Sequence, residues 1–371
     1  MALNQVGLER LNTATTKKIG TSKNLIINGA QSIAQRGTSS TSNGFATVDR
    51  FLIFYDNTDE APTQSQGTVA SDVTPYTLGF RKTYKIQNGN QTSGAGADDA
   101  LIILYRVEAQ DLASSGWNYT SASSNVTFSF WVKSSVSQNF FFTLKTGDGT
   151  PQKFAMETGS LTADTWTKVT KTIPGNSNLQ FDNDNGEGLE IEWSLFRGTN
   201  ATGSMSLNAW AANNNSVRTP DQTSTWYTTN DATFEITGVQ LEVGSVATDF
   251  EHRLFAEDLA LCQRYFQLIG KVGSNAGVAA GFTTTTDFHG YGCLPGGEMR
   301  AAPTIAVSGT LSHLSYTHTA VSSTANTLQN LGTGRDTYVI RIIGNSSTTG
   351  NAGAYARIEN ASSALTFSSE L

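Results

Sequence analysis

The stretch FEITGVQLEVGSVATDFEHRLFAEDLALCQRYFQ, residues 234–267, determines how we interpret the rest of the chain. Its first part alternates apolar and polar residues from Phe234 to Val243, with a slip of one position at Gly238. Alternation predicts a strand, and a slip at a glycine is typical of a β-bulge, where one extra residue shifts the alternation. We therefore expect a bulged strand that closes a β domain.

The second part of the same stretch changes its period. Its apolar residues follow one another at spacings of four, three, four and three: Phe255, Leu259, Cys262, Phe266 and Ile269. This spacing places them on one face of an amphipathic helix. Acidic residues fall in its first turn and a glycine follows its end, as helix termini favour. We expect a helix over residues 254–269 that links the strand to a second domain.

The composition is that of a β-rich protein with few charges. The 371 residues include 35 glycines, and only 15% are charged. Net charge is −7 and basic residues form no run, whereas binding to a phosphate backbone needs clustered Lys and Arg, so nucleic acid is not an expected partner. No apolar run approaches the roughly 20 residues of a membrane-spanning helix, so membrane insertion is not expected. The N-terminus also lacks the apolar region of a secretory signal.

About ten strand candidates at short spacing, without helices between them, precede residue 254. This pattern predicts an all-β sandwich. Further strand candidates after residue 270 predict a smaller β domain, in which DTYVIRII (336–343) is the strongest strand. The expected organisation is an N-terminal attachment arm (1–23), a β-sandwich (24–253), a linking helix (254–269) and a C-terminal β domain (270–371).

Catalytic and metal-binding patterns are sparse. No nucleophile motif accompanies the four histidines, so we expect no enzymatic activity. Asp182, Asp184 and Glu187 offer hard oxygen ligands on a glycine-containing turn, which makes Ca²⁺ the one candidate cofactor. A solvated turn that leads into a strand is the alternative interpretation, because the spacing does not match an EF-hand.

Four aromatic residues in polar loops are candidate glycan contacts. Trp117, Trp210, Trp226 and Tyr227 stand among Asn, Ser and Thr residues. Aromatic rings that stack on sugar CH groups, with amide hydrogen bonds beside them, have the chemistry for glycan binding. The alternative is that each ring folds back as a core plug.

Several stretches resemble a family of bacteriophage virion proteins, especially of marine and cyanobacterial phages, of the tail-fibre or carbohydrate-binding-module-like type. The matching pieces are NLIINGAQSIAQRGTSST (24–41), SFWVKSS (129–135), ITGVQLEVGSVATDFEHR (236–253), DLALCQRYF (258–266) and PGGEMRAAPTIAVSG (295–309). The resemblance implies a jelly-roll sandwich, a homotrimer and a place on the virion surface, reached from the host cytoplasm. In a trimer, Phe255, Leu259, Cys262 and Phe266 become candidate oligomer contacts, and the alternative is that the helix packs on its own sandwich.

Together these observations predict a tail fibre or receptor-binding fibre. It would attach to other virion proteins through residues 1–23 and bind host cell-surface polysaccharide. A purely structural capsid decoration, head fibre or tail collar protein without glycan binding is the first alternative. A polysaccharide depolymerase is the second.

Overall fold

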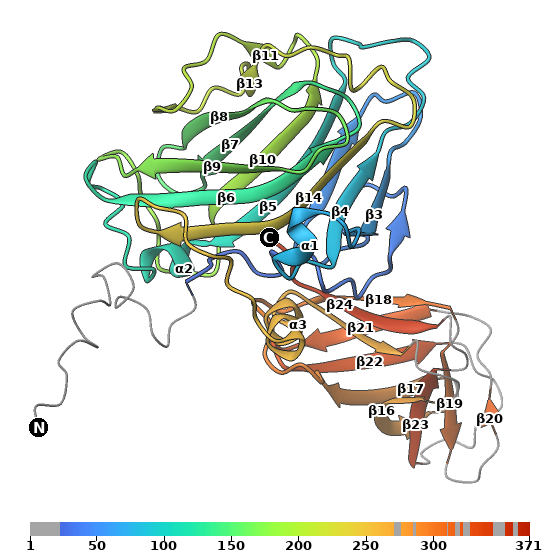
Figure 1. Cartoon of the computed structure of the whole chain (residues 1–371). Helices are drawn as coiled ribbons and strands as arrows, with labels where there is room; N and C mark the ends of the chain where they lie inside the picture. The colour runs from blue at the N-terminus through green and yellow to red at the C-terminus, as the bar shows by residue number, and fades with distance from the viewer. Residues whose placement is uncertain are drawn as a thin grey trace, which may run out of the picture.

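The protein consists of a large β-sandwich and a smaller β domain that follows it in the chain (Figure 1). The computed structural model describes residues 23–270, 276–284, 287–309, 311–315, 320–321, 327–343, 353–358 and 363–371. The predicted arm therefore lies outside the described residues, apart from Lys23. Among the described residues, no helix is both long and apolar enough to cross a membrane.

The sandwich is a jelly roll of two six-stranded antiparallel sheets, as the sequence predicted. Sheet A has the order β1 (Ser39–Ser40), β3 (Thr63–Thr68), β4 (Lys82–Gln87), β14 (Thr233–Val243), β6 (Asn125–Ser134), β9 (Thr167–Pro174). Sheet B has the order β12 (Trp210–Ala212), β8 (Gln152–Ser160), β7 (Asn139–Thr146), β10 (Glu187–Arg197), β5 (Ala100–Glu108), β2 (Leu52–Asp56).

Smaller elements lie between these strands. The expectation of no helices there was wrong, because two single-turn helices interrupt the strands. The two helices are α1 (Thr74–Thr77) and α2 (Ala109–Ala113). A short parallel pair is formed by β11 (Thr202–Gly203) and β13 (Thr219–Pro220).

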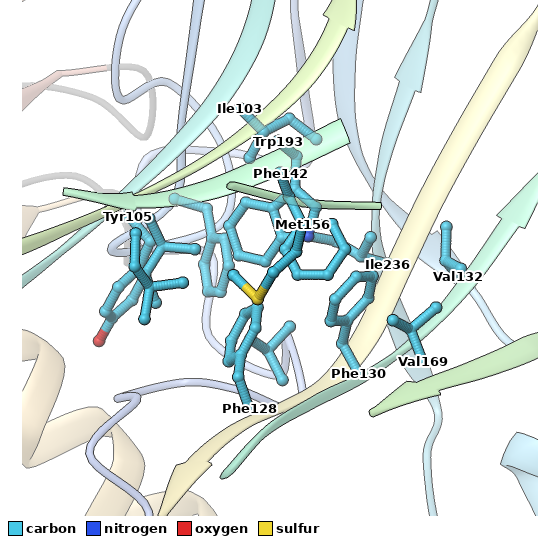
Figure 2. Close-up of a cluster of buried hydrophobic side chains, with 14 of the residues drawn as sticks. Ile103, Tyr105, Phe128, Phe130, Val132, Phe142, Met156, Val169, Trp193 and Ile236 are labelled. Atoms are coloured by element: carbon cyan, nitrogen blue, oxygen red, sulfur yellow. The ribbon is translucent and has the colours of Figure 1, made fainter. Parts of the chain in front are cut away.

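The core lies between the two sheets and follows from the alternation of each strand. Figure 2 shows apolar side chains from both sheets meeting in this layer. Trp193 of sheet B lies among Phe128 and Phe130 of sheet A, with ring centroids 5.8 and 5.7 Å away. Because these side chains face inward, their sequence neighbours on each strand face outward.

The bulge predicted at Gly238 is present in β14. The pairing of β14 with β6 shifts register between Thr237 and Gln240, and Gly238 has a φ of +61°. A Cβ atom at Gly238 would come within 2.6 Å of the Phe80 ring, so the position requires glycine for both its dihedral and its space. The interpretation of the slip as a β-bulge is confirmed.

The predicted linking helix is shorter than expected. The helix α3 spans Phe255–Gln263, and the chain then forms a strand, β15 (Phe266–Gly270), that pairs with β24 (Ala364–Ser368). Hydrogen bonds to a segment about a hundred residues away thus take over where the apolar spacing alone predicts helix. A helix reaching residue 269 was wrong for this reason.

The C-terminal domain packs a three-stranded sheet on a seven-stranded one. The first sheet joins β15 and β24 to β18 (Thr304–Ser308). The second has the order β20 (Ala320–Val321), β19 (Leu311–Ser315), β23 (Gly353–Ile358), β16 (Ala276–Thr283), β17 (Asp287–Cys293), β22 (Thr337–Ile343), β21 (Thr327–Thr333). Tyr338, Ile340 and Ile342 are buried in its core, which confirms DTYVIRII as a strand.

Ion pairs join the two domains, beside the point where β24 lies next to the sandwich (Figure 1). Glu370 pairs with Arg50 and with Arg36, whose Nη2 is 2.9 Å from the Glu370 Oε1. A second contact joins the end of α3 to the end of β5: Arg264 donates two hydrogen bonds to the buried Glu108 carboxylate, at 2.8 and 2.7 Å. The domains are therefore joined by charged contacts that are largely shielded from water.

Candidate functional site

Three of the four aromatic residues predicted to contact glycan are core residues. Trp117, Trp226 and Tyr227 are at most 3% exposed. The Trp226 Nε1 donates to the Thr233 carbonyl at 3.0 Å, and Tyr227 stacks on Phe196 with ring centroids 4.2 Å apart. Their loops fold back over the core, so exposure of these three rings to a sugar was a wrong expectation.

Trp210 is the exception, because it lies on the edge strand β12 and is only partly buried. Its Nε1 donates to the Pro174 carbonyl at 2.7 Å, and its ring lies 5.2 Å from the Phe154 ring. The indole is thus anchored by its N–H and by packing against Phe154.

The three predicted metal ligands do not converge. Asp182 and Asp184 are exposed, whereas an oxygen of Glu187 lies 2.7 Å from the Arg106 guanidinium. Asp184 accepts a hydrogen bond from the backbone of Gly186, so it stabilises the turn itself. In the part of the chain that the structure describes, no three His, Cys, Asp or Glu side chains are placed to hold a metal ion. Geometry thus supports the solvated-turn alternative, and Ca²⁺ binding stays a prediction.

The four predicted oligomer contacts do not share an exposed face. Phe255 is 63% exposed and Leu259 is half-buried, but Cys262 and Phe266 are buried within the same chain. Phe266 belongs to β15, whose pairing turns its side chain into the protein. The prediction that these four residues together form a contact between chains was therefore wrong. Cys262 and Cys293 are free thiols.

A groove on the outer face of sheet B is the strongest candidate site. It encloses about 280 Å³, and its floor comes from β2, β5, β7, β8 and β10. The segment 213–218, just after β12, contributes one wall. Because Ile103 and Tyr105 face the core, the intervening side chains of β5 face the groove. The lining residues are Phe54, Ile102, Leu104, Arg106, Lys145, Lys153, Glu190, Glu192, Arg197, Asn213, Asn215 and Arg218.

Charged side chains form a row across four neighbouring strands of this floor. Arg106 is paired in register with Glu190, Glu190 with Lys145, and Lys145 with Lys153. The Glu190 carboxylate accepts from Arg106 Nη2 at 2.9 Å and from Lys145 Nζ at 2.6 Å. Burial raises the pKa of Glu190, but Lys145 and Arg106 outweigh burial and hold the pKa below its ordinary value. Glu190 is therefore an ionised acceptor at neutral pH.

A second ion pair lies beside this row. Glu192 and Arg197, both nearly buried, are 2.8 Å apart. Lys153 is 6% exposed, and its Nζ donates to the Arg218 carbonyl at 2.8 Å. Burial lowers the pKa of Lys153, because an ammonium is poorly solvated there. The floor thus offers both hydrogen-bond donors and acceptors in fixed positions.

This groove was not predicted from the sequence, although a signal for it was present. Charged residues interrupt the apolar strands ALIILYRVE and GLEIEWSLF at Arg106, Glu190 and Glu192. Charges at outward positions of central strands are costly unless they are paired.

The fold and the groove define a jelly-roll β-sandwich protein with a hollow, hydrogen-bonding face on one sheet. No protein-family profile matches the chain. No curated protein matches it either.

Solved structures that resemble the chain include two carbohydrate-binding proteins and one phage protein. The tandem CBM22-1–CBM22-2 domain of Paenibacillus barcinonensis Xyn10C is 11% identical, with a TM-score of 0.28 over 95% of this chain and 100% of that one. The family 11 carbohydrate-binding module of Clostridium thermocellum Lic26A-Cel5E is 13% identical, with a TM-score of 0.26 over 58% and 98%. The enzymatically active domain of bacteriophage CBA120 tailspike protein 4 is 8% identical, with a TM-score of 0.31 over 60% of this chain and 21% of that one.

Proposed function

We propose that the protein is a bacteriophage virion surface protein, of the tail-fibre or receptor-binding type, that binds host polysaccharide in the groove of sheet B. The groove carries the binding proposal. Small-molecule sites are concave, with apolar surface and a few fixed polar groups. A sugar needs the same combination, because its ring has apolar CH faces and a rim of hydroxyl groups.

Phe54 supplies the aromatic surface of this site. It is 38% exposed on β2 and paired in register with Ile102, so it extends an apolar strip beside the charged row. A ring on a sheet is held in place by its neighbours and loses little conformational freedom on binding. Phe54 is therefore a better candidate for stacking on a sugar than the buried loop aromatics.

Replacing Phe54 with alanine should weaken polysaccharide binding about fivefold to tenfold, since aromatic contacts contribute on the order of 1 kcal/mol beyond area burial. Affinity gel electrophoresis of the full chain against host-surface polysaccharides would measure the change. Phe282→Ala is the matched control, because Phe282 is 51% exposed on β16, away from sheet B. Equal loss in both variants, or no retention of the unmodified protein, would contradict the proposal.

The virion part of the proposal is supported by the sequence resemblance. In the proposed assembly, residues 1–23 attach the protein to the particle, and three chains assemble so that the sandwich faces outward. Leu254 and Phe255 remain exposed at the start of α3 and are available for contact between chains. Size-exclusion chromatography with light scattering should give three times the mass of one chain, and a monomer would refute the trimer.

The structural alternative is favoured by one observation. Three of the five cations in the groove already pair with carboxylates, as Arg197 does with Glu192, so much of the charge is compensated without any ligand. A capsid decoration, head fibre or tail collar protein would show no retention by any polysaccharide.

The depolymerase alternative is favoured by Glu187 and Glu190. Both contact Arg106. Burial and the neighbouring Glu190 charge raise the pKa of Glu187, whereas Lys145 and Arg106 outweigh burial and lower the pKa of Glu190. Opposed shifts in two carboxylates can mark an acid and a base. We propose a structural role for this pair, since Arg106 and Lys145 clamp both side chains. Release of reducing ends from a bound polysaccharide would support the enzyme instead.

A further inference from the structure

The charges of the groove are unequal in number. Five cationic side chains line it, but only two carboxylates do, and Glu187 reaches the network from outside as a third. The whole chain carries a net charge of −7, so an excess of positive charge here runs against the average of the protein. The cations are Arg106, Lys145, Lys153, Arg197 and Arg218.

Two of these cations lack a carboxylate partner among the described residues. Arg106 and Lys145 share Glu190, and Arg197 pairs with Glu192. The other two donate to backbone carbonyls: Lys153 Nζ to the Arg218 carbonyl at 2.8 Å, and Arg218 Nε to the Asn215 carbonyl at 3.2 Å. The excess charge is therefore concentrated at the end of the row formed by β8 and the segment 213–218.

The charge of Lys153 is only partly compensated, because the nearby Glu192 and Glu190 carboxylates already pair with other cations. Its ammonium is nearly buried, and its cross-strand neighbour is Lys145, a like charge. Like charges directly opposite each other destabilise a sheet, and a buried ammonium is poorly solvated. An anionic group bound beside Lys153 would offset both effects.

Arg218 is placed to receive the same anion. It is exposed on the groove wall, and its own carbonyl holds Lys153. A guanidinium binds carboxylate or sulfate through two parallel hydrogen bonds. Lys153 thus provides a buried point charge and Arg218 an accessible donor pair at one end of the groove.

We infer that the groove selects an acidic polysaccharide, whose carboxylate or sulfate groups bind at Lys153 and Arg218 while a sugar ring packs on Phe54. This inference rests on the proposed function, since it names the class of glycan that the groove binds. A neutral glycan would add no counter-charge at Lys153 and Arg218.

Binding of the full chain to polygalacturonate, dextran sulfate and neutral dextran would test the inference. We expect at least one of the two acidic polymers to bind about tenfold more tightly than dextran, since a hydrogen bond to a charged group contributes about 1.5 kcal/mol or more. The two acidic arms distinguish carboxylate from sulfate. Single-stranded DNA serves as a polyanion without the sugar chemistry.

Two variants locate the anion site. Lys153→Met should weaken binding of the preferred acidic polymer about tenfold, as expected for loss of one charged hydrogen bond. Arg218→Gln should weaken it about threefold, because the residue is exposed. Lys168→Gln is the control, with an exposed lysine on β9 of sheet A. The melting temperature of each variant would show whether it folds. If Lys153→Met is destabilised, Arg218→Gln still tests the anion site.

The outcomes separate the two levels of the proposal. Equal or tighter binding of dextran, unaffected by Lys153→Met and Arg218→Gln, would overturn the acidic selectivity and leave glycan binding intact. No retention by any polysaccharide would overturn both. DNA binding as tight as that of the acidic polymers would show that the groove recognises charge alone, and would overturn the inference.

Discussion

Replacing Trp226 with alanine is expected to lower the free energy of unfolding by about 3–5 kcal/mol, the usual cost of removing a large aromatic side chain from a core. Trp226 is fully buried, its Nε1 donates to the Thr233 carbonyl at 3.0 Å, and its ring meets Phe140 edge-on. The substitution leaves a cavity, and the Thr233 carbonyl keeps only its hydrogen bond from the Ser135 backbone N–H, at 3.0 Å. Urea denaturation followed by circular dichroism would measure the loss.

Trp210→Ala is the matched comparison. Trp210 is partly exposed on the edge strand β12, so its removal should cost about 1–2 kcal/mol, less than a fully buried side chain. If Trp226→Ala kept full stability and instead abolished polysaccharide binding, the ring would have to be accessible in solution. The interpretation of Trp226 as a core plug would then be wrong.

Replacing Glu370 with glutamine should destabilise the contact between the two domains by about 3–5 kcal/mol, the typical cost of removing one partner from a buried ion pair. Arg50 is 1% exposed and would lose the carboxylate that neutralises it. Its remaining contacts include the Arg106 carbonyl at 2.7 Å and the rings of Tyr265 and Tyr105, whose centroids lie 3.4 and 5.4 Å from the guanidinium carbon. A buried cation without a carboxylate partner disfavours the contact between the two domains.

The loss should be visible as uncoupled unfolding. Differential scanning calorimetry of Glu370→Gln is expected to separate the C-terminal domain into an earlier transition. Glu298→Gln is the control, because the Glu298–Arg335 pair is exposed and should contribute less than about 1 kcal/mol. Identical thermograms for the two variants would mean that Glu370 does not hold the domains together.

The strands of the sandwich could be predicted because their signal is local. β5 is the apolar run ALIILYRVE, and in β6 the apolar residues Val126, Phe128, Phe130 and Val132 recur at every second position. Alternation along one strand already states which side chains face a core. The bulge at Gly238 was predictable for the same reason, since it disturbs the alternation where it occurs.

The end of the linking helix and the fate of the loop aromatics were not predictable in this way. The spacing of Phe255, Leu259, Cys262 and Phe266 is helical, but the last of these pairs with Ser368 in a sheet. Whether Trp226 covers the core or meets solvent depends on which surface its loop reaches. Both outcomes depend on contacts between residues far apart in the chain.

The sequence by itself determined the all-β class, the core-facing side of most strands, the bulge at Gly238 and the presence of a second β domain, because each follows from the period of neighbouring residues. Tertiary structure alone decided where α3 ends, which aromatics are buried and where the groove lies. The groove arises because sheet pairing brings Arg106, Glu190, Lys145 and Lys153 side by side from four separate strands. Their charges can be compared only once the strand order places them in one row.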